Sequence, residues 1–238
     1  MRVAALYDIH GNVPALEAVL AEVEQEGVDA IVVGGDVVSG PQPAEPLDML
    51  EALGERVRFI RGNADREVLE NAADEKSAWC RSQLGDERAA RVAAWPLTVS
   101  LDVDGLGAVC FCHATPRSDE EIVTRITPED EVARALEGTR EALVVCGHTH
   151  VQYDRRIRER RLVCAGSVGW PYEGRTGAFW LLVGPEISRR RTDYDVQRAV
   201  DLTRAASGYR DREEVAGFLL EPPDPDEVSA YFESLRGT

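Results

Sequence analysis

The chain has 238 residues, of which 44% are hydrophobic and 29% are charged, as in an ordinary globular protein. Its 27 basic and 43 acidic residues give a net charge of −16 at pH 7. This charge argues against a broad surface for long nucleic acids or anionic membranes, and it favours the recruitment of metal cations. No apolar run approaches the roughly 20 residues that cross a bilayer, and the N-terminal apolar stretch is too short for a signal peptide.

Five cysteines are scattered along the chain, mostly inside apolar runs. Their number is odd and no CxxC pair occurs, so neither a disulfide framework nor a structural zinc site is expected. Reduced, buried cysteines are expected instead, together with a cytoplasmic location.

The first 60 residues predict alternating strands and helices. Three short apolar runs predict buried strands at residues 2–7, 30–33 and 57–60. Apolar residues at helical spacing predict a helix over 13–26, with Asn12 as N-cap and Gly27 as its stop. A second helix is marked by leucines and closed by Gly54. This order implies a parallel sheet with right-handed crossovers.

Residues 66–94 are predicted to be mostly helical, and a strand-rich region follows Trp95-Pro96. Its predicted strands cover 98–103, 108–112, 143–146, 152–157, 162–165, 178–183 and 187–194. Asp104-Gly105 is a hairpin signal, and a second hairpin is expected near residue 160.

Four further helices are predicted in the second half of the chain. The first covers 128–137, where Thr127 and Asp130 suggest the N-terminal cap. The last three lie near the C-terminus, at 195–207, 211–220 and 225–235. They carry no recognised motif.

Metal-ligand side chains stand at the ends of apolar runs. They are Asp8 and His10, Asp36, Asn63, His113, and His148 and His150, a set that holds all four histidines of the chain. Taken singly, an Asp after a strand is often a turn former, and a lone His often lies in the core. Because ligands bind beyond the carboxyl ends of strands in open α/β sheets, we expect these side chains to share one crevice.

Seven nitrogen and oxygen ligands are too many for one ion. They suit two divalent ions that share a bridging carboxylate. No thiolate is required, so Mn²⁺ is expected first, with Fe²⁺, Zn²⁺ or Ni²⁺ as alternatives.

The ordered set resembles the motifs of the calcineurin-like metallophosphoesterase superfamily. These motifs are Asp8-x-His10, Gly35-Asp36, Gly62-Asn63, His113 and Gly147-His148-x-His150. The flanking residues 8–12, 62–65 (Gly-Asn-Ala-Asp) and 166–169 (Gly-Ser-Val-Gly) resemble its small bacterial and archaeal phosphodiesterase branch. The resemblance implies an α/β fold of two β-sheets packed face to face, with helices on both outer sides.

The resemblance also implies a role for each ligand. One metal would take Asp8, His10 and His150, the second would take Asn63, His113 and His148, and Asp36 would bridge both. A hydroxide held between the ions is the expected nucleophile. Asn63, His113 and Asn12 are the candidate catalytic residues. Asn12 would contact phosphate or water, or would serve only as a helix N-cap.

One position departs from the common pattern. Many members have a histidine where this chain has Ala64, and that histidine resembles a general acid for the leaving oxygen. The small phosphodiesterase branch also lacks it, so the change does not argue for an inactive protein. It predicts dependence on leaving groups that depart easily or on a substituted proton donor. A catalytic role for the neighbouring Asp65 is not expected.

The predicted organisation is a metallophosphoesterase domain over 1–194 and a C-terminal helical extension over 195–238, packed on the same domain. The predicted function is metal-dependent hydrolysis of small phosphodiesters, with phosphomonoesters or nucleotides as further substrates. The alternatives are a non-catalytic metal-binding scaffold of the same fold and a nuclease. No feature points to a particular oligomeric state.

The arginines of 155–161 and 189–191 form either a positive rim for phosphate esters or a solvated ribbon paired with acidic residues.

Overall fold

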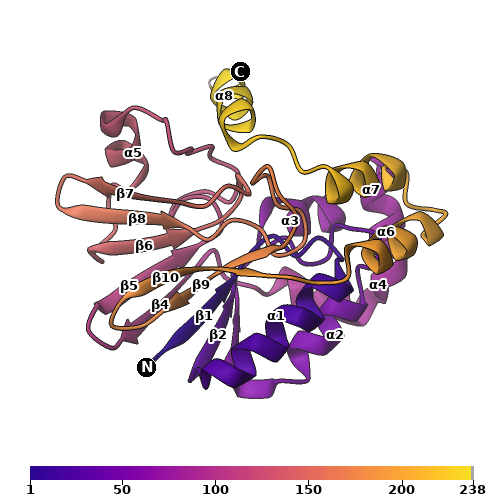
Figure 1. Ribbon diagram of the computed structural model, residues 1–238, viewed down its shortest axis with the longest axis horizontal. Coiled ribbons are helices and arrows are strands. Elements are labelled where there is room, and N and C mark those ends of the chain that lie inside the picture. The colour runs from indigo at the N-terminus through magenta and orange to yellow at the C-terminus, as the bar shows by residue number, and fades with distance from the viewer. Residues whose placement is uncertain (237–238) are drawn as a thin grey trace.

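The computed structural model describes residues 1–236, in which two five-stranded β-sheets pack face to face (Figure 1). The first sheet has the order β10-β9-β1-β2-β3. Its strands are β1 (Val3–Leu6), β2 (Ala30–Val33), β3 (Val57–Phe59), β9 (Ala178–Val183) and β10 (Ile187–Thr192). The parallel pairing of β1, β2 and β3 confirms the predicted alternation, whereas β9 runs antiparallel to β1.

The second sheet has the order β4-β5-β6-β8-β7. Its strands are β4 (Thr98–Val103), β5 (Gly107–Cys112), β6 (Leu143–Cys146), β7 (Tyr153–Ile157) and β8 (Arg160–Cys164). Both predicted hairpins are confirmed, since β4 pairs antiparallel with β5 and β7 with β8. The central strands β5, β6 and β8 are parallel, which directs the chain after β5 and β6 to the same edge.

An apolar layer joins the two sheets. Alternate residues of β1, such as Val3 and Ala5, pack against Val109 and Val145 of the second sheet. Tyr7 is fully buried in this layer, and its hydroxyl donates a hydrogen bond to the carbonyl of Val145 over 3.1 Å. Tyr7 therefore ties β1 to β6 beside the strand ends.

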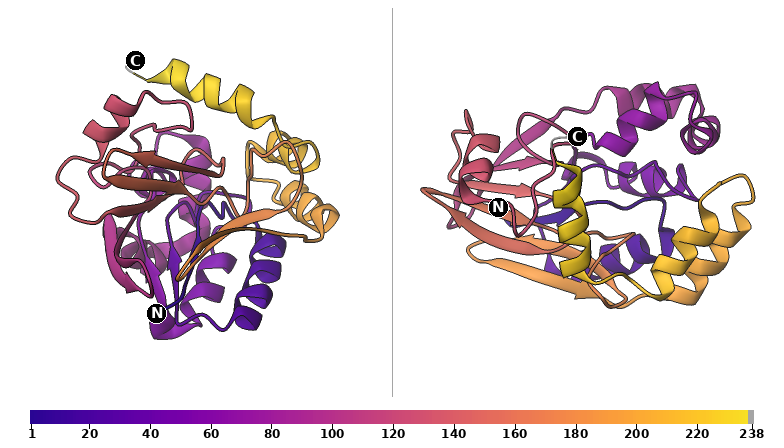
Figure 2. Two further views of the ribbon diagram at one scale, coloured as in Figure 1. Left: turned by 60° about the vertical axis from the view of Figure 1, so that its left-hand side comes forward. Right: turned by 90° about the horizontal axis from the view of Figure 1, so that it is seen from above.

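Helices cover the outer face of each sheet, which gives the predicted four layers (Figure 2). The helices that share a core with the first sheet are α1 (Val13–Glu26), α2 (Glu45–Glu51), α3 (Asn63–Glu70), α4 (Glu75–Ala93), α6 (Val196–Ala205) and α7 (Arg212–Leu220). On the second sheet, α5 (Glu129–Ala135) buries Val132 and Ala135. The remaining elements are the 3-10 helix η1 (Gly54–Arg56) and α8 (Pro225–Leu235).

The helix over residues 66–94 is divided, and its start is earlier than expected. Asn63 already begins α3, and Asp74 starts α4 by accepting a hydrogen bond from the backbone N–H of Ser77. Inside α4 the chain bends at Gly85, where φ is +72°. A glycine tolerates this left-handed conformation, which no pattern of apolar spacing reveals.

The predicted cap of α5 is wrong. Pro128 occupies the N-cap position and no side chain caps the helix. The Thr127 hydroxyl instead accepts a hydrogen bond from the backbone N–H of Thr124 and donates one to Glu233 of α8. The Thr127 hydroxyl therefore bonds to a residue that is distant in the sequence and does not cap the start of α5.

The C-terminal helices extend the fold in two ways. Helices α6 and α7 pack into the core of the first sheet through residues such as Val200 and Val215. Helix α8 lies apart from them and extends toward α5 (Figure 2).

None of the helices in residues 1–236 is long and apolar enough to span a membrane. All five cysteines are free and buried, as predicted.

Candidate metal centre

The strand ends bring the predicted ligands together. Asp8 and His10 follow β1, Asp36 follows β2, and His150 belongs to the segment after β6. One ligand atom from each of these four buried residues lies within 4.8 Å of the others. Four separate positions along 140 residues of chain therefore supply a single compact donor set.

The other three predicted ligands surround this cluster. The Nε2 atom of His113, after β5, lies 3.0 Å from Asn63 Oδ1 and 3.4 Å from Asp36 Oδ2. The His148 ring lies with its centroid 5.2 Å from that of His113. These residues form a second group of donors that meets the first at Asp36.

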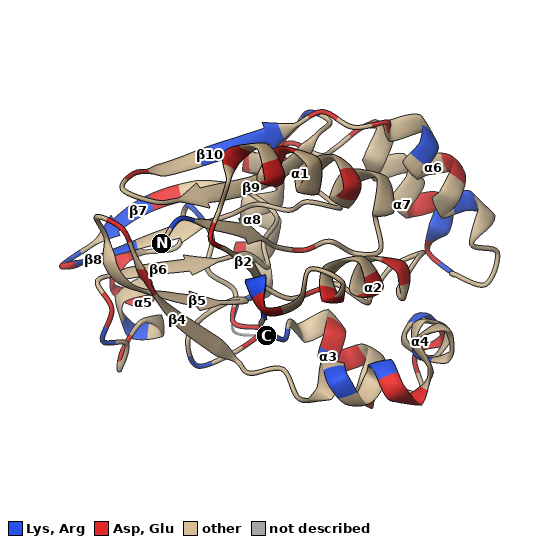
Figure 3. Ribbon diagram, turned by 90° about the horizontal axis from the view of Figure 1, so that it is seen from below, with Lys and Arg blue, Asp and Glu red and all other residues tan. Residues whose placement is uncertain are grey.

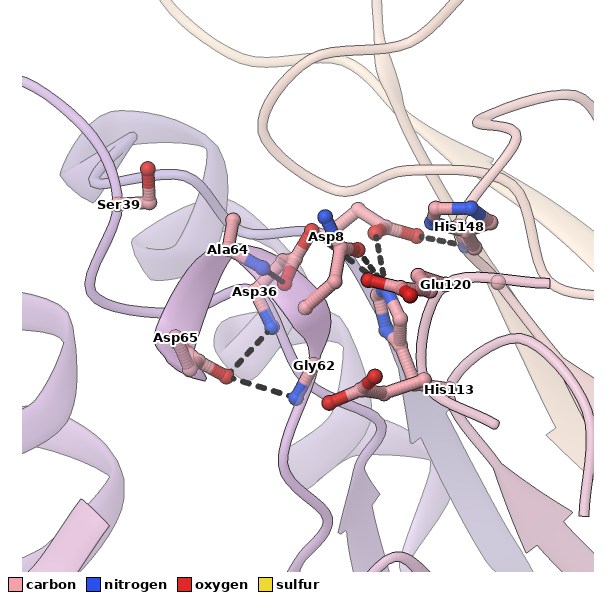
Figure 4. A network of polar contacts seen from close by, with 12 residues as sticks. Asp8, Asp36, Ser39, Gly62, Ala64, Asp65, His113, Glu120 and His148 are labelled. Carbon is pink, nitrogen blue, oxygen red and sulfur yellow. Dashed lines mark hydrogen bonds and ion pairs between the residues drawn. The ribbon is translucent and has the colours of Figure 1, made fainter. Parts of the chain in front are cut away.

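Asp36 stands between the two groups. Its Oδ1 accepts a hydrogen bond from the backbone N–H of Ala64 over 2.9 Å (Figure 4). Its Oδ2 lies 3.6 Å from His10 Nε2 and 3.4 Å from His113 Nε2. One carboxylate oxygen thus faces an imidazole of each group, as a bridging ligand requires.

Three histidines are oriented by backbone carbonyls. The Nδ1 atoms of His10, His113 and His150 lie 2.9, 2.8 and 2.6 Å from the carbonyl oxygens of Ser39, Gly34 and Trp170. A carbonyl only accepts hydrogen bonds, so each Nδ1 carries a proton and each Nε2 is the ring nitrogen left to bind a metal ion. This outer arrangement is the one that fixes metal-binding imidazoles in proteins.

Unsatisfied polar atoms mark the same place. Asp8 Oδ1 and His148 Nε2 are buried and have no hydrogen-bond partner among residues 1–236. The Nε2 atoms of His10 and His150 face one another over 3.2 Å. Buried lone pairs in this arrangement are unfavourable unless a cation or a proton lies between them. The donor set therefore fits divalent metal ions.

The backbone is strained at the ligands. Six non-glycine residues in the described chain have a left-handed φ. Five of them are predicted ligands, with φ between 46° and 70°: Asp8, His10, Asp36, His148 and His150. Such conformations cost free energy in residues other than glycine, and they persist at sites where function requires them.

Glycines let the ligand loops approach one another closely. A Cβ added at Gly62 would lie 2.1 Å from Asp36 Oδ1, and one at Gly147 would lie 2.5 Å from Asp8 Oδ2. Asp8 Oδ2 also accepts a hydrogen bond from the backbone N–H of His148 over 3.0 Å. Any side chain at either glycine would displace a carboxylate of the cluster.

Asp65 supports the backbone that carries Asp36, a role that was not predicted from the sequence. Its buried carboxylate accepts hydrogen bonds from the backbone N–H groups of Asp36, Val37, Val38 and Gly62, over 2.8 to 3.1 Å (Figure 4). Burial and the neighbouring Asp36 raise the pKa of Asp65 to about 7. Its place three residues after the Gly62 N-cap is a capping-box spacing, which was the available signal.

At pH 7 His10, His148 and Asp36 are held in the forms that bind cations, whereas His113 is protonated and would have to release a proton to bind one. Burial lowers the pKa of His10 and of His148 to about 4, so both are neutral at pH 7. Burial opposes ionisation of Asp36, but the nearby His113 and His10 hold its pKa below the usual value. Burial also lowers the pKa of His113, but Asp36 and Asp8 outweigh it and raise the value to about 10.

Asn12 has its side chain fully occupied by protein partners. Its Oδ1 caps α1 by accepting from the backbone N–H of Ala15, and its Nδ2 donates to the carbonyl of Gly169 and to the Tyr194 hydroxyl. The N-cap alternative is therefore confirmed. Contact with phosphate stays a prediction that these hydrogen bonds do not favour. Ser167 is occupied as well, since its hydroxyl donates to the carbonyl of Asp8.

Four of the eight arginines in the two clusters, Arg158, Arg161, Arg190 and Arg191, form ion pairs with acidic residues of the described chain. Figure 3 shows the basic and acidic positions along β7, β8 and β10. Arg161 binds Asp154 through two hydrogen bonds, and Arg158 pairs with Asp130. On β10, Arg190 pairs with Glu26. These contacts favour a solvated, charge-paired ribbon over a rim for phosphate esters.

Comparison with known proteins identifies the family. The model of the calcineurin-like phosphoesterase superfamily domain matches residues 1–183, so the chain belongs to this superfamily. It is 24% identical over 226 residues to the uncharacterized protein MJ0912 of Methanocaldococcus jannaschii, covering 84% of this chain and 90% of that protein. It is 36% identical to phosphodiesterase YfcE of Escherichia coli over 77 residues, 29% of this chain and 42% of YfcE.

A solved structure shows the same fold. The metallophosphoesterase from Sphaerobacter thermophilus matches with a TM-score of 0.73 and 23% sequence identity, over 98% of both chains. The two-sheet sandwich expected from the motifs is therefore the fold of the chain, and its general activity is that of a phosphoesterase.

Replacing Asp65 by Asn tests the positioning role of its carboxylate. The amide Nδ2 of Asn would face backbone N–H donors, so we expect the free energy of unfolding to fall by about 1–3 kcal/mol. Affinity for Mn²⁺ should also fall, since the Asp36 backbone loses its support. Urea unfolding of the metal-free protein and calorimetric Mn²⁺ titration measure both. Glu120→Gln, at an exposed carboxylate nearby, is the control. Unchanged stability and affinity in Asp65→Asn would contradict the role.

Proposed function

We propose that the protein is a dinuclear metal-dependent phosphodiesterase acting on small phosphate esters. The position of Asp36 carries the proposal, because its Oδ2 faces His10 on one side and His113 on the other. Membership of the phosphoesterase superfamily supports the reaction class. The partial similarity to YfcE, which is named a phosphodiesterase, supports diesters as substrates.

Two groups of residues would hold the ions. Asp8, His10 and His150 belong to one, Asn63, His113 and His148 to the other, and Asp36 to both. Imidazole, carboxylate and amide donors without thiolate suit Mn²⁺ first, with Fe²⁺, Zn²⁺ or Ni²⁺ as alternatives. When bound, such ions lower the pKa of water and neutralise charge that develops on a phosphate.

The chain's own contribution is to hold the donors ready. The carbonyls of Ser39, Gly34 and Trp170 fix three imidazoles with Nε2 directed inward. Asp65 fixes the backbone that carries Asp36. Because these hydrogen bonds orient the donors toward one another, they favour binding of metal ions with little reorganisation of the site.

Position 64 itself supplies no imidazole to protonate a leaving oxygen. Ala64 contributes its backbone N–H to Asp36 and has only a methyl side chain. The protein should therefore act best on esters whose leaving group departs without a proton, such as nitrophenolate. We also propose that it works in the cytoplasm, which is supported by five free thiols.

Metal reconstitution tests the proposed activity. Protein depleted of metal should hydrolyse bis-p-nitrophenyl phosphate only after Mn²⁺ is added, measured by release of p-nitrophenolate. Iron, zinc and nickel are tested in parallel. Absence of turnover with every ion, in protein shown to have bound metal, would favour the non-catalytic scaffold. Digestion of single-stranded DNA faster than the model diester would favour a nuclease.

Substitution of the bridging carboxylate should affect turnover far more than substitution at position 64. Asp36→Asn replaces a charged oxygen between His10 and His113 by a neutral amide, so turnover should fall by more than about 100-fold. Ala64→His leaves every ligand in place, and its loss should be much smaller. Both variants are assayed with saturating Mn²⁺ after circular dichroism has verified folding. A fully active Asp36→Asn would refute the two-metal assignment.

A further inference from the structure

An aromatic pocket lies beside the metal centre. It has a volume of about 470 Å³, within the range of small-molecule sites. Trp170 and Tyr172, in the segment after β8, form one wall, and Phe218 of α7 belongs to the second. Tyr231 and Phe232 of α8 complete the lining. None of the motif residues predicted from the sequence lies in this wall.

The pocket is continuous with the proposed ligands. The Tyr172 ring stacks on His150 with centroids 4.8 Å apart and planes inclined by 24°. The Trp170 ring lies 5.4 Å from His10, and the Phe232 ring lies 6.4 Å from His148. A molecule whose phosphate reached the ligands would therefore place an attached group against these rings.

Helix α8 is held in position as a pocket wall. At its C-terminal end Arg236 pairs with Glu131, and Glu233 accepts a hydrogen bond from Thr124. Near its N-terminal end Asp226 pairs with Arg125. These contacts tie α8 to α5 and to the segment before it, away from α7 (Figures 1 and 2). Contacts near both ends of α8 therefore fix it as a wall of the pocket.

The charge of the lining selects what can bind. Glu214 and Glu227 line the pocket, and the lining contains neither Lys nor Arg. Neither carboxylate has a hydrogen bond or an ion pair with residues 1–236, whereas most nearby acidic groups are paired. Both carboxylates are exposed, and exposed carboxylates beside aromatic rings suit a flat group that carries N–H donors. Their negative charge disfavours a second phosphate or a carboxylate at this place.

We propose that this pocket binds the base of a nucleoside phosphodiester, and that the base carries an exocyclic amino group. The ring of Phe218 would stack on the base, the Tyr172 ring, inclined by 73° to that of Phe218, would contact its edge, and Glu214 or Glu227 would accept a hydrogen bond from the amino group. The proposal rests on the proposed phosphodiesterase function and names its substrate class. Stacking of a base on aromatic side chains is the usual source of such affinity.

Nucleoside binding tests the pocket without turnover. Full-length protein loaded with Mn²⁺ is titrated with adenosine by calorimetry, and with ribose to remove the base. Adenosine should bind at least about tenfold more tightly than ribose. Phe218→Ala should remove most of that difference. Leu220→Ala, at an exposed leucine of α7 outside the lining, should not change it.

The amino group is tested by a second probe and a second variant. Purine riboside lacks only the amino group of adenosine and should bind several-fold more weakly. The double variant Glu214→Gln, Glu227→Gln changes two exposed side chains, so folding is not at risk, and it should bring adenosine close to the level of purine riboside.

Two outcomes would overturn the proposal. One is equal binding of adenosine and ribose by the unaltered protein. The other is a dimer in light scattering that Phe218→Ala converts to monomer, without adenosine binding, which would make the aromatic wall a surface for a second copy. Hydrolysis of bis-p-nitrophenyl phosphate is measured on the same sample. Turnover without adenosine binding rejects only the pocket assignment, and adenosine binding without turnover rejects only the phosphodiesterase.

Discussion

The site depends on a strained backbone at the ends of the strands. Asp8, His10, Asp36, His148 and His150 all have left-handed φ values, a conformation that costs free energy in residues other than glycine. At these residues the chain leaves the extended conformation of the strands, and the left-handed turns direct the side chains of the separate loops to a common point. The core must hold these turns in place, and the buried parallel strands β1, β2, β5 and β6 do so on both sides of the site.

The ligands are supported by the loops of their neighbours. The Asp65 carboxylate holds the chain from Asp36 to Val38, and Asp8 accepts the backbone N–H of His148 from the other sheet. Trp170 links two functions, because its carbonyl orients His150 while its ring lines the aromatic pocket. A shift of Trp170 in the proposed base-binding wall would therefore also change the orientation of the metal ligand His150. The same geometry offers one route by which the bound base would influence the metal site.

The sequence indicated which side chains would lie together, because that signal is local. Apolar runs ending in Asp or His located the strand ends, and Asn12 with Gly27 delimited α1 correctly. Long-range partners were not predictable in this way. The hydroxyl of Thr127 bonds to Glu233 of α8, about 100 residues later in the chain. The carboxylate of Asp65 accepts hydrogen bonds from the loop after β2, nearly 30 residues earlier. The aromatic pocket arises from three separate segments whose residues show no shared spacing, so only the folded chain reveals it.

The number of metal ions bound per chain is the most direct test of whether Asp36 joins two groups of ligands into one dinuclear site. Mn²⁺-loaded protein is freed of excess metal, and bound manganese is measured by atomic emission against protein concentration. We expect two manganese ions per chain in the unaltered protein and fewer than two in Asp36→Asn, with both samples folded. One ion per chain at saturation, or two ions retained with unchanged affinity in Asp36→Asn, would contradict it.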